Sequence, residues 1–219
     1  MNQTYMKEKK IFPLVMSMAL PMMLSMAFNS LYNIVDSYFV AKLSEDAMTA
    51  LSLVYPAQNL LTAVAVGFGV GVNAMISFYL GAQNQEKADK TATQGIVLGV
   101  LHGVLLMLLF LCGMNWFLGM FTKSDAVRAL GMEYSNVVFL FSVIVTGGIT
   151  LEKIFQAVGR MRATMVSMIA GFVTNIVLDP LLIFGIGPFP RMEIAGAALA
   201  TGIGQVITLL VYLIYYVAD

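Results

Sequence analysis

The stretch NIVLDPLLIFG, residues 175–185, places an aspartate and a proline inside a run that is apolar enough to cross a membrane. The run extends over residues 163–186, and ~20 residues suffice to span a hydrocarbon core. A lone carboxylate in hydrocarbon costs several kcal/mol, with estimates from ~2.5 upward. Asp179 must therefore be protonated, face a water-filled cavity or hold a cation.

The composition of the whole chain agrees with a membrane environment. Hydrophobic residues make up 59% of the chain and charged residues 11%, so polar surface cannot cover a soluble core. We therefore predict an integral membrane protein. The net charge is zero, which provides no basic face for a nucleic acid partner. The single cysteine, Cys112, excludes a disulfide framework and a thiolate metal cluster.

Six apolar segments follow one another along the chain, and each is long enough to span a bilayer. No linker between them is long enough to separate two domains, so residues 1–219 are expected to form a single six-helix transmembrane domain of the all-α class. The segments are 12–41, 49–80, 91–119, 128–157, 163–186 and 194–217.

The distribution of basic residues predicts that both termini are cytoplasmic. With the amino terminus inside, eight basic residues lie on the cytoplasmic side and four outside, which follows the positive-inside rule. Lys153 would then lie at a cytoplasmic helix end and snorkel beside Glu152, as a solvated end rather than a site. The inner set is Lys7, Lys9, Lys10, Lys87, Lys90, Lys153, Arg160 and Arg162, and the outer set is Lys42, Lys123, Arg128 and Arg191.

Two aspartates, Asp36 and Asp179, are deep in apolar segments, and every basic residue falls at a segment end or in a loop. Asn175 lies four residues before Asp179, so its amide and the carboxylate project from the same helix face. Pro180 has no N–H, which leaves the carbonyl of Ile176 without its usual helical donor. Such hard oxygen ligands suit sodium or a proton, unlike the nitrogen and sulfur ligands that zinc prefers.

A second row of polar side chains lies in the first segment. Ser25, Asn29, Asn33 and Asp36 follow a spacing of i, i+4, i+8 and i+11, with Tyr32 beside them. This spacing lines up polar groups on one face of a helix. We interpret that face as the lining of an internal cavity.

Several stretches together resemble the amino-terminal half of a multidrug and toxic compound extrusion (MATE) family transporter. The resemblance covers nearly all of residues 12–210. The matching stretches are NIVDSYFVAKLSEDAMTALSLVYP (33–56), GFGVGVNAMISFYLGAQNQEKADK (67–90), FQAVGRMRA (155–163), NIVLDPLLIFG (175–185) and IAGAALAT (194–201).

The resemblance implies one lobe of a twelve-helix transporter that exports organic cations by alternating access. Export would be driven by sodium or protons, with no other cofactor, and the chain would not be an enzyme. The family's cation-site positions are occupied here by Asp36, Asn175, Asp179 and Thr201. The implied partners are the lipid bilayer and cationic amphiphilic small molecules, and the implied location is a bacterial or archaeal plasma membrane.

The chain ends at YYVAD, residues 215–219, where the second lobe of such a transporter would begin. We therefore expect a fragment, a split half that pairs with a second six-helix lobe, or a half that pairs with a second copy of itself. The cation site lies within one lobe, so it is expected to work in this chain alone.

Other functions remain as alternatives. A lipid-linked sugar flippase of the same superfamily would need a strongly basic cavity for pyrophosphate, and the lysines and arginines are not placed to line one. An intramembrane aspartyl protease lacks its GxGD pattern here, because Asp179 lies in LDP, and His102 has no GxSx partner for a rhomboid protease. A non-transporting structural or regulatory half-protein is a further alternative.

Overall fold

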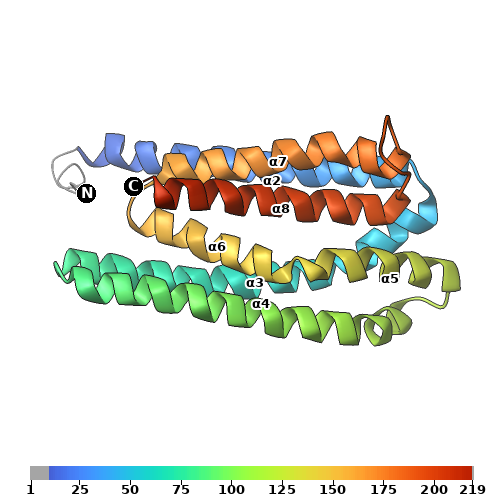
Figure 1. Cartoon of the computed structure of the whole chain (residues 1–219), viewed down its shortest axis with the longest axis horizontal. Coiled ribbons are helices and arrows are strands. Elements are labelled where there is room, and N and C mark those ends of the chain that lie inside the picture. The colour runs from blue at the N-terminus through green and yellow to red at the C-terminus, as the bar shows by residue number, and fades with distance from the viewer. Residues whose placement is uncertain (1–9, 219) are drawn as a thin grey trace.

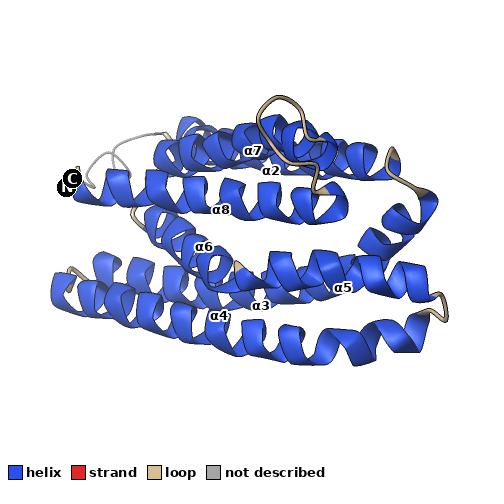
Figure 2. Ribbon diagram, turned by 45° about the vertical axis from the view of Figure 1, so that its right-hand side comes forward, coloured by secondary structure: helices blue, strands red, loops and turns tan. Residues whose placement is uncertain are grey.

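The computed structural model describes residues 10–218, apart from the side chains of Met18 and Asn29. Throughout this part the regular secondary structure is helical (Figure 2). The helices, as labelled in Figure 1, are α2 (Ile11–Ala41), α3 (Glu45–Gly81), α4 (Gln85–Phe121), α5 (Asp125–Leu140), α6 (Ser142–Ala157), α7 (Met161–Phe184) and α8 (Glu193–Val217).

Five of these helices are long and apolar enough to cross a membrane, and α5 and α6 together form a sixth span with a bend of 48°. Five of the six apolar segments of the sequence lie within these helices, and the segment 163–186 extends two residues beyond the end of α7 at Phe184. The all-α membrane fold predicted from the sequence is therefore confirmed.

Helices α3 and α4 begin before the apolar segments that they contain, because polar residues cap them. The hydroxyl of Ser44 accepts a hydrogen bond from the backbone N–H of Ala47, at 3.0 Å. The side-chain carbonyl of Asn84 accepts one from the N–H of Lys87, at 3.1 Å. These caps satisfy N–H groups that a helix start otherwise leaves unpaired, so each helix extends beyond the hydrocarbon region.

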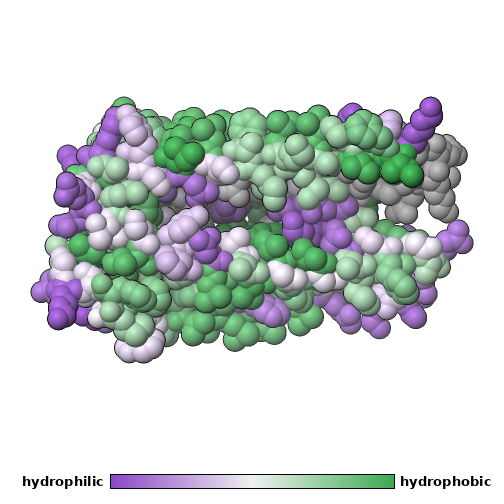
Figure 3. Space-filling view, turned by 180° about the vertical axis from the view of Figure 1, so that it is seen from behind, coloured by the Kyte–Doolittle hydropathy of each residue, from purple (hydrophilic) through white to green (hydrophobic). Residues whose placement is uncertain are grey.

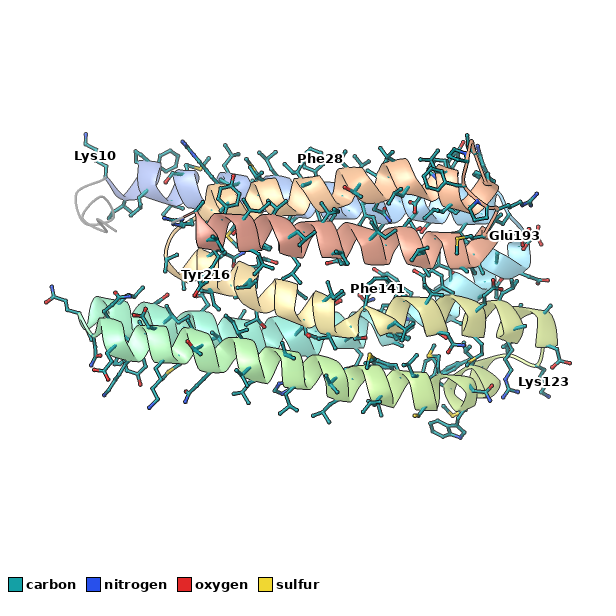
Figure 4. All side chains as sticks on the ribbon, viewed as in Figure 1. Lys10, Phe28, Lys123, Phe141, Glu193 and Tyr216 are labelled. Carbon is teal, nitrogen blue, oxygen red and sulfur yellow. The ribbon has the colours of Figure 1, made fainter. Side chains whose placement is uncertain are left out.

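The helices form two layers (Figure 1). Helices α2, α7 and α8 lie on one side, α3 and α4 lie on the other, and the bent α5–α6 span lies between them. The start of α2 and the end of α8 lie at one end of the bundle, which we call the terminal end, together with the α3–α4 and α6–α7 loops. Figure 4 shows Lys10 and Tyr216 near this end and Lys123 and Glu193 near the opposite end.

The largest apolar core joins the two layers toward the end opposite the termini. Residues from every helix except α6 contribute to it, including Val40, Leu51, Leu118, Tyr134 and Ile183. Large apolar side chains on the outer faces of the bundle are exposed, as expected for a surface in contact with lipid.

The sequence predicted one uninterrupted segment at 128–157, and the structure corrects this, because the helix breaks at Phe141. The ring of Phe141, labelled in Figure 4, lies against Gly202 of α8, where any Cβ would overlap it. Next to the break, the hydroxyl of Ser142 donates a 2.6 Å hydrogen bond to the carbonyl of Phe139. The segment itself contains no proline, and the break coincides with this contact between distant parts of the chain.

Helices α7 and α8 contact each other backbone to backbone. A Cβ added at Gly204 would lie 2.8 Å from the carbonyl oxygen of Gly171, and one added at Gly196 would lie 2.7 Å from the carbonyl oxygen of Leu182. Small residues at a helix interface permit such close approach in a membrane. We call this contact the α7–α8 seam, and it holds together two helices that carry candidate site residues.

We predict that Gly204→Leu lowers the melting temperature of the detergent-purified chain by several degrees. Leucine has the better helix propensity, by up to ~1 kcal/mol, but forcing a side chain into a filled interface costs ~1–3 kcal/mol or more. The measurement is thermal unfolding followed by circular dichroism. Gly113→Leu in α4 is the matched control, because a Cβ there meets nothing within 4 Å. Equal melting of the two variants would contradict the close seam.

Candidate cation site

Three helices bring four polar side chains into the interior of one layer. Asp36 comes from α2, Asn175 and Asp179 come from α7, and Thr201 comes from α8. All four are buried, and their exposed fractions are 6%, 2%, 0% and 8% respectively. The four residues that the family resemblance implied are thus all buried in helices that pack on one another.

Hydrogen bonds connect three of these residues. The side-chain N–H₂ of Asn175 donates to Oδ1 of Asp179 and to the hydroxyl of Thr201, each at 3.3 Å. The amide of Asn175 is thereby oriented with its nitrogen toward its neighbours. This leaves its oxygen, Oδ1, without a hydrogen bond to any described residue.

Two further buried oxygens also lack a hydrogen-bond partner among the described residues. Oδ1 of Asp36 and Oδ2 of Asp179 are buried and receive no hydrogen bond from the described part of the chain. The two carboxylates are also close enough to interact electrostatically. Buried polar atoms without partners are uncommon and costly, so the three acceptor oxygens of Asp36, Asn175 and Asp179 are suited to a partner that supplies a proton or a positive charge.

The chemistry of this set fits a small hard cation. Sodium and protons bind carboxylate and amide oxygens, whereas transition metals favour nitrogen and sulfur ligands. Among the described residues, three or more His, Cys, Asp or Glu side chains do not converge on a common point, so the site has carboxylates from only two residues. Asp36 and Asp179 would bind the cation directly, with the oxygen of Asn175 as a neutral ligand and Thr201 as an adjacent hydroxyl.

A cavity of about 830 Å³ lies between the two layers, lined by residues from every described helix except α4. Asp36 and Thr201 line this cavity, whereas Asn175 and Asp179 lie behind them in the α2–α7–α8 layer. Figure 3 shows hydrophilic residues along the groove between the layers and apolar residues on the outer faces. The candidate ion site therefore adjoins the cavity through Asp36.

The proposed cavity face of the first segment is only partly found in the structure. Tyr32 and Asn33 line the cavity, and the ring of Tyr32 stacks on Phe172 at 5.5 Å between centroids. Ser25 is not among the described residues that line the cavity, and its buried hydroxyl donates a 2.9 Å hydrogen bond to the carbonyl of Pro21 in its own helix. The prediction for Asn29 concerns a side chain outside the described residues.

The interpretation of Glu152 and Lys153 as a solvated helix end is wrong. Their side chains are only 16% and 13% exposed, and both line the cavity. The stem of Lys153 packs over Gly69 of α3, where a Cβ would lie 2.8 Å from Cγ of the lysine. The feature of the sequence that could have indicated this burial is Gly69, which makes room for the stem of Lys153. Hydropathy alone does not reveal that the two residues face each other.

A family model described as MatE matches residues 21–181 of the chain. The chain belongs to the MatE family. It resembles the multidrug export protein MepA of Staphylococcus aureus, strain NCTC 8325 / PS 47, with 31% identity over 216 residues, which cover 98% of this chain and 47% of MepA. MepA of Staphylococcus haemolyticus is 30% identical over 213 residues and is covered to 46%. The chain thus spans about half the length of the curated relatives it matches.

Solved structures agree with this assignment. An outward-facing multidrug resistance MATE family transporter of the MOP superfamily matches with a TM-score of 0.87 and 28% identity, over 93% of this chain and 44% of that one. A MOP superfamily transporter from Pyrococcus furiosus matches equally well, with a TM-score of 0.87 and 28% identity. The fold is therefore one lobe of a MATE-type transporter, and the protein is an integral membrane protein.

The comparisons bear on the alternatives as well. The similar proteins are named as export proteins and transporters, which agrees with the prediction that the chain is not an enzyme. The flippase alternative is not favoured. Lys153 does line the cavity, contrary to the prediction that no basic residue would, but it is paired with Glu152 at 2.9 Å and does not make a strongly basic cavity.

We predict that Asp36→Asn and Asp179→Asn each lower the affinity for sodium at least tenfold, which corresponds to ~1.4 kcal/mol. Each change removes a negative charge and keeps the shape of the side chain. The measurement is the melting temperature of the purified chain against sodium concentration at fixed ionic strength, with potassium as the reference ion.

Asp46→Asn is the matched control, because Asp46 is an exposed aspartate in the first turn of α3. Its sodium response should equal that of the unmodified chain. The assignment of the site fails if both variants of the buried aspartates retain full sodium affinity.

Proposed function

We propose that this chain is one lobe of an antiporter that exports organic cations by alternating access, driven by sodium or protons. The observation that carries the proposal is the group of three buried, unpartnered oxygens of Asp36, Asn175 and Asp179 beside a cavity of about 830 Å³. The family membership of the chain and the names of its relatives support the same function.

The coupling arises from competition for the carboxylates. Sodium and a proton satisfy the same oxygens of Asp36 and Asp179, so one displaces the other. An occupant of Asp36 also alters the charge that faces the cavity, because Asp36 lines it. Each occupant selects a conformation only if it binds the two conformations unequally, and a coupling of ~1 to 3 kcal/mol provides a useful bias.

The lining of the cavity suits a cationic amphiphile. Tyr55, Tyr134 and Phe172 offer aromatic faces for an apolar body or a positive charge, and Met48 and Met168 offer flexible thioethers that adapt to different shapes. Asp36 and Glu152 supply negative charge. Such a mixture permits many ligands, in keeping with relatives named for multidrug export.

Transport across the whole membrane requires a second lobe in this proposal. The relatives are about twice as long as this chain, which covers 47% of MepA. A second six-helix lobe, or a second copy of this chain, would complete the path. The ion site, in contrast, is formed by α2, α7 and α8 alone.

We further propose that the terminal end is cytoplasmic. Figure 1 shows the start of α2, the end of α8 and the α3–α4 and α6–α7 loops at the same end of the bundle. Described basic residues toward this end outnumber those toward the opposite end, as the positive-inside rule requires. The first group is Lys10, Lys87, Lys90, Lys153, Arg160 and Arg162, and the second is Lys42, Lys123, Arg128 and Arg191.

An antiporter requires that its two cargoes weaken each other's binding. We predict that saturating sodium raises the dissociation constant of tetraphenylphosphonium for the purified chain about 5- to 150-fold, as a coupling of that size demands. Lowering the pH in the absence of sodium should act in the same direction, because protons occupy the same carboxylates. Isothermal titration calorimetry provides the affinities.

In the Asp36→Asn variant the affinity for tetraphenylphosphonium should no longer depend on sodium. Asp46→Asn serves again as the control that keeps the dependence. Binding of the organic cation that sodium leaves unchanged, or strengthens, would rule out antiport through this site.

The proposed orientation predicts where an impermeant thiol reagent reacts. In a Cys112→Ser background, cysteine at Lys123 should react in intact cells, and cysteine at Glu86 only after the cells are permeabilised. Both positions are exposed and near opposite ends of α4. The reverse pattern would place the termini outside.

A further inference from the structure

Three side chains of α6 form a closed ring of hydrogen bonds on the wall of the cavity. The ammonium of Lys153 donates to Oε1 of Glu152 at 2.9 Å and to the side-chain oxygen of Gln156 at 3.2 Å. The amide of Gln156 in turn donates to Oε1 of Glu152 at 2.7 Å. We call this group the α6 ring.

The α6 ring lies well away from the candidate ion site. Glu152 is near enough to Tyr212 of α8 to interact with it electrostatically, whereas Thr201 of α8 belongs to the ion site. From residue 201 to residue 212 an α-helix rises about 16 Å, at ~1.5 Å per residue. A ligand at Glu152 therefore shares the cavity with Asp36 without sharing its ligands.

Glu152 is suited to accept a further donor. Both hydrogen bonds that it accepts fall on Oε1, and within the described part of the chain Oε2 accepts none. Gly148, one helical turn earlier, also lines the cavity, and a Cβ there would meet nothing within 4 Å. The carboxylate of Glu152 thus has open space beside it in the cavity and one oxygen free to accept a hydrogen bond.

Lys153 is the internal counter-ion of this carboxylate. Among the described residues that line the cavity, Asp36 and Glu152 are the acids and Lys153 is the base. The lysine stem is held by Gly69, so its ammonium stays at the carboxylate. A positively charged ligand with N–H groups can replace the hydrogen bonds of the ammonium, whereas a quaternary cation can replace only its charge.

We propose that Glu152 binds an N–H-bearing cationic group, such as an amine, amidine or guanidine, of the exported compound, in competition with the ammonium of Lys153. This inference rests on the proposed function, since it names the residue that selects the class of substrate. The ammonium of Lys153 lowers the affinity of Glu152 for every cation, because the cation must displace it. Cations with N–H groups are favoured, because they replace the hydrogen bonds that the ammonium donated. The organic cation at Glu152 then lies about 16 Å from the ion site along α8. The organic cation and the ion influence each other through the charge in the cavity.

The test compares two ligands that each carry a single positive charge on a substituent of a phenyl ring. Benzamidinium has N–H donors and phenyltrimethylammonium has none. Their affinities for the purified full chain are measured by calorimetry in the absence of sodium, for Glu152→Gln, for Lys153→Met and for the exposed control Glu133→Gln. Methionine retains the packing of the lysine stem over Gly69.

Glu152→Gln should weaken benzamidinium about tenfold or more and phenyltrimethylammonium clearly less, since only the first loses charge-assisted hydrogen bonds. Lys153→Met should strengthen both ligands several-fold. Glu133→Gln should change neither. The sodium-dependent rise in melting temperature should persist in all three variants, which also shows that they are folded.

An unchanged affinity of Glu152→Gln for benzamidinium, or weaker binding by Lys153→Met, would overturn the inference. Should Glu152→Gln lose its sodium response through misfolding, Lys153→Met decides alone, and tighter binding supports the inference. A wild-type chain that responds to sodium and binds neither ligand would instead contradict the proposed export of organic cations, so the two failures are distinguishable.

Discussion

The contact between the backbones of α7 and α8 is the constraint on which the rest of this lobe depends. Gly171, Gly196 and Gly204 leave no room for a Cβ, and this brings Asn175 of one helix within hydrogen-bonding distance of Thr201 of the other. A wider separation would break that bond and leave one N–H of the buried amide unpaired, at a cost of ~1–3 kcal/mol. Close packing of small residues thus allows a polar site inside an apolar layer.

Much of this fold could be predicted from the sequence because the hydrocarbon core of a membrane permits few backbone structures. Long apolar segments must be helices, since no water satisfies an exposed backbone there. The i, i+4 spacing of Asn175 and Asp179 correctly predicted that their side chains would meet. The pairing with Asp36 and Thr201 came from the family resemblance, because spacing within one helix does not say which other helix packs against it.

What could not be predicted depends on contacts between helices. The break at Phe141 coincides with the contact of its ring with Gly202, which is distant in the sequence and offers space for the ring. Ser25 shares a helix face with Asp36, yet its hydroxyl bonds to its own backbone, as serine in a helix often does. Lys153 lies near the end of an apolar segment and was expected in solvent, but Gly69 of α3 gives its stem a place in the interior.

The two charged regions of the cavity differ in how their negative charge is balanced, and this difference assigns them different tasks. Asp36 and Asp179 have no cationic partner in the described chain, so in the proposed function a mobile ion would supply one and the site would respond to the ion gradient. Glu152 has a fixed partner in Lys153, so it stays neutralised whichever ion is present. A site that is balanced internally cannot sense the gradient, but it can exchange one cation for another. Asp36 and Thr201 belong to both the candidate ion site and the cavity wall, and Asp36 is the charged one of the two. In the proposed function, the ion and the organic cation would therefore affect each other through Asp36.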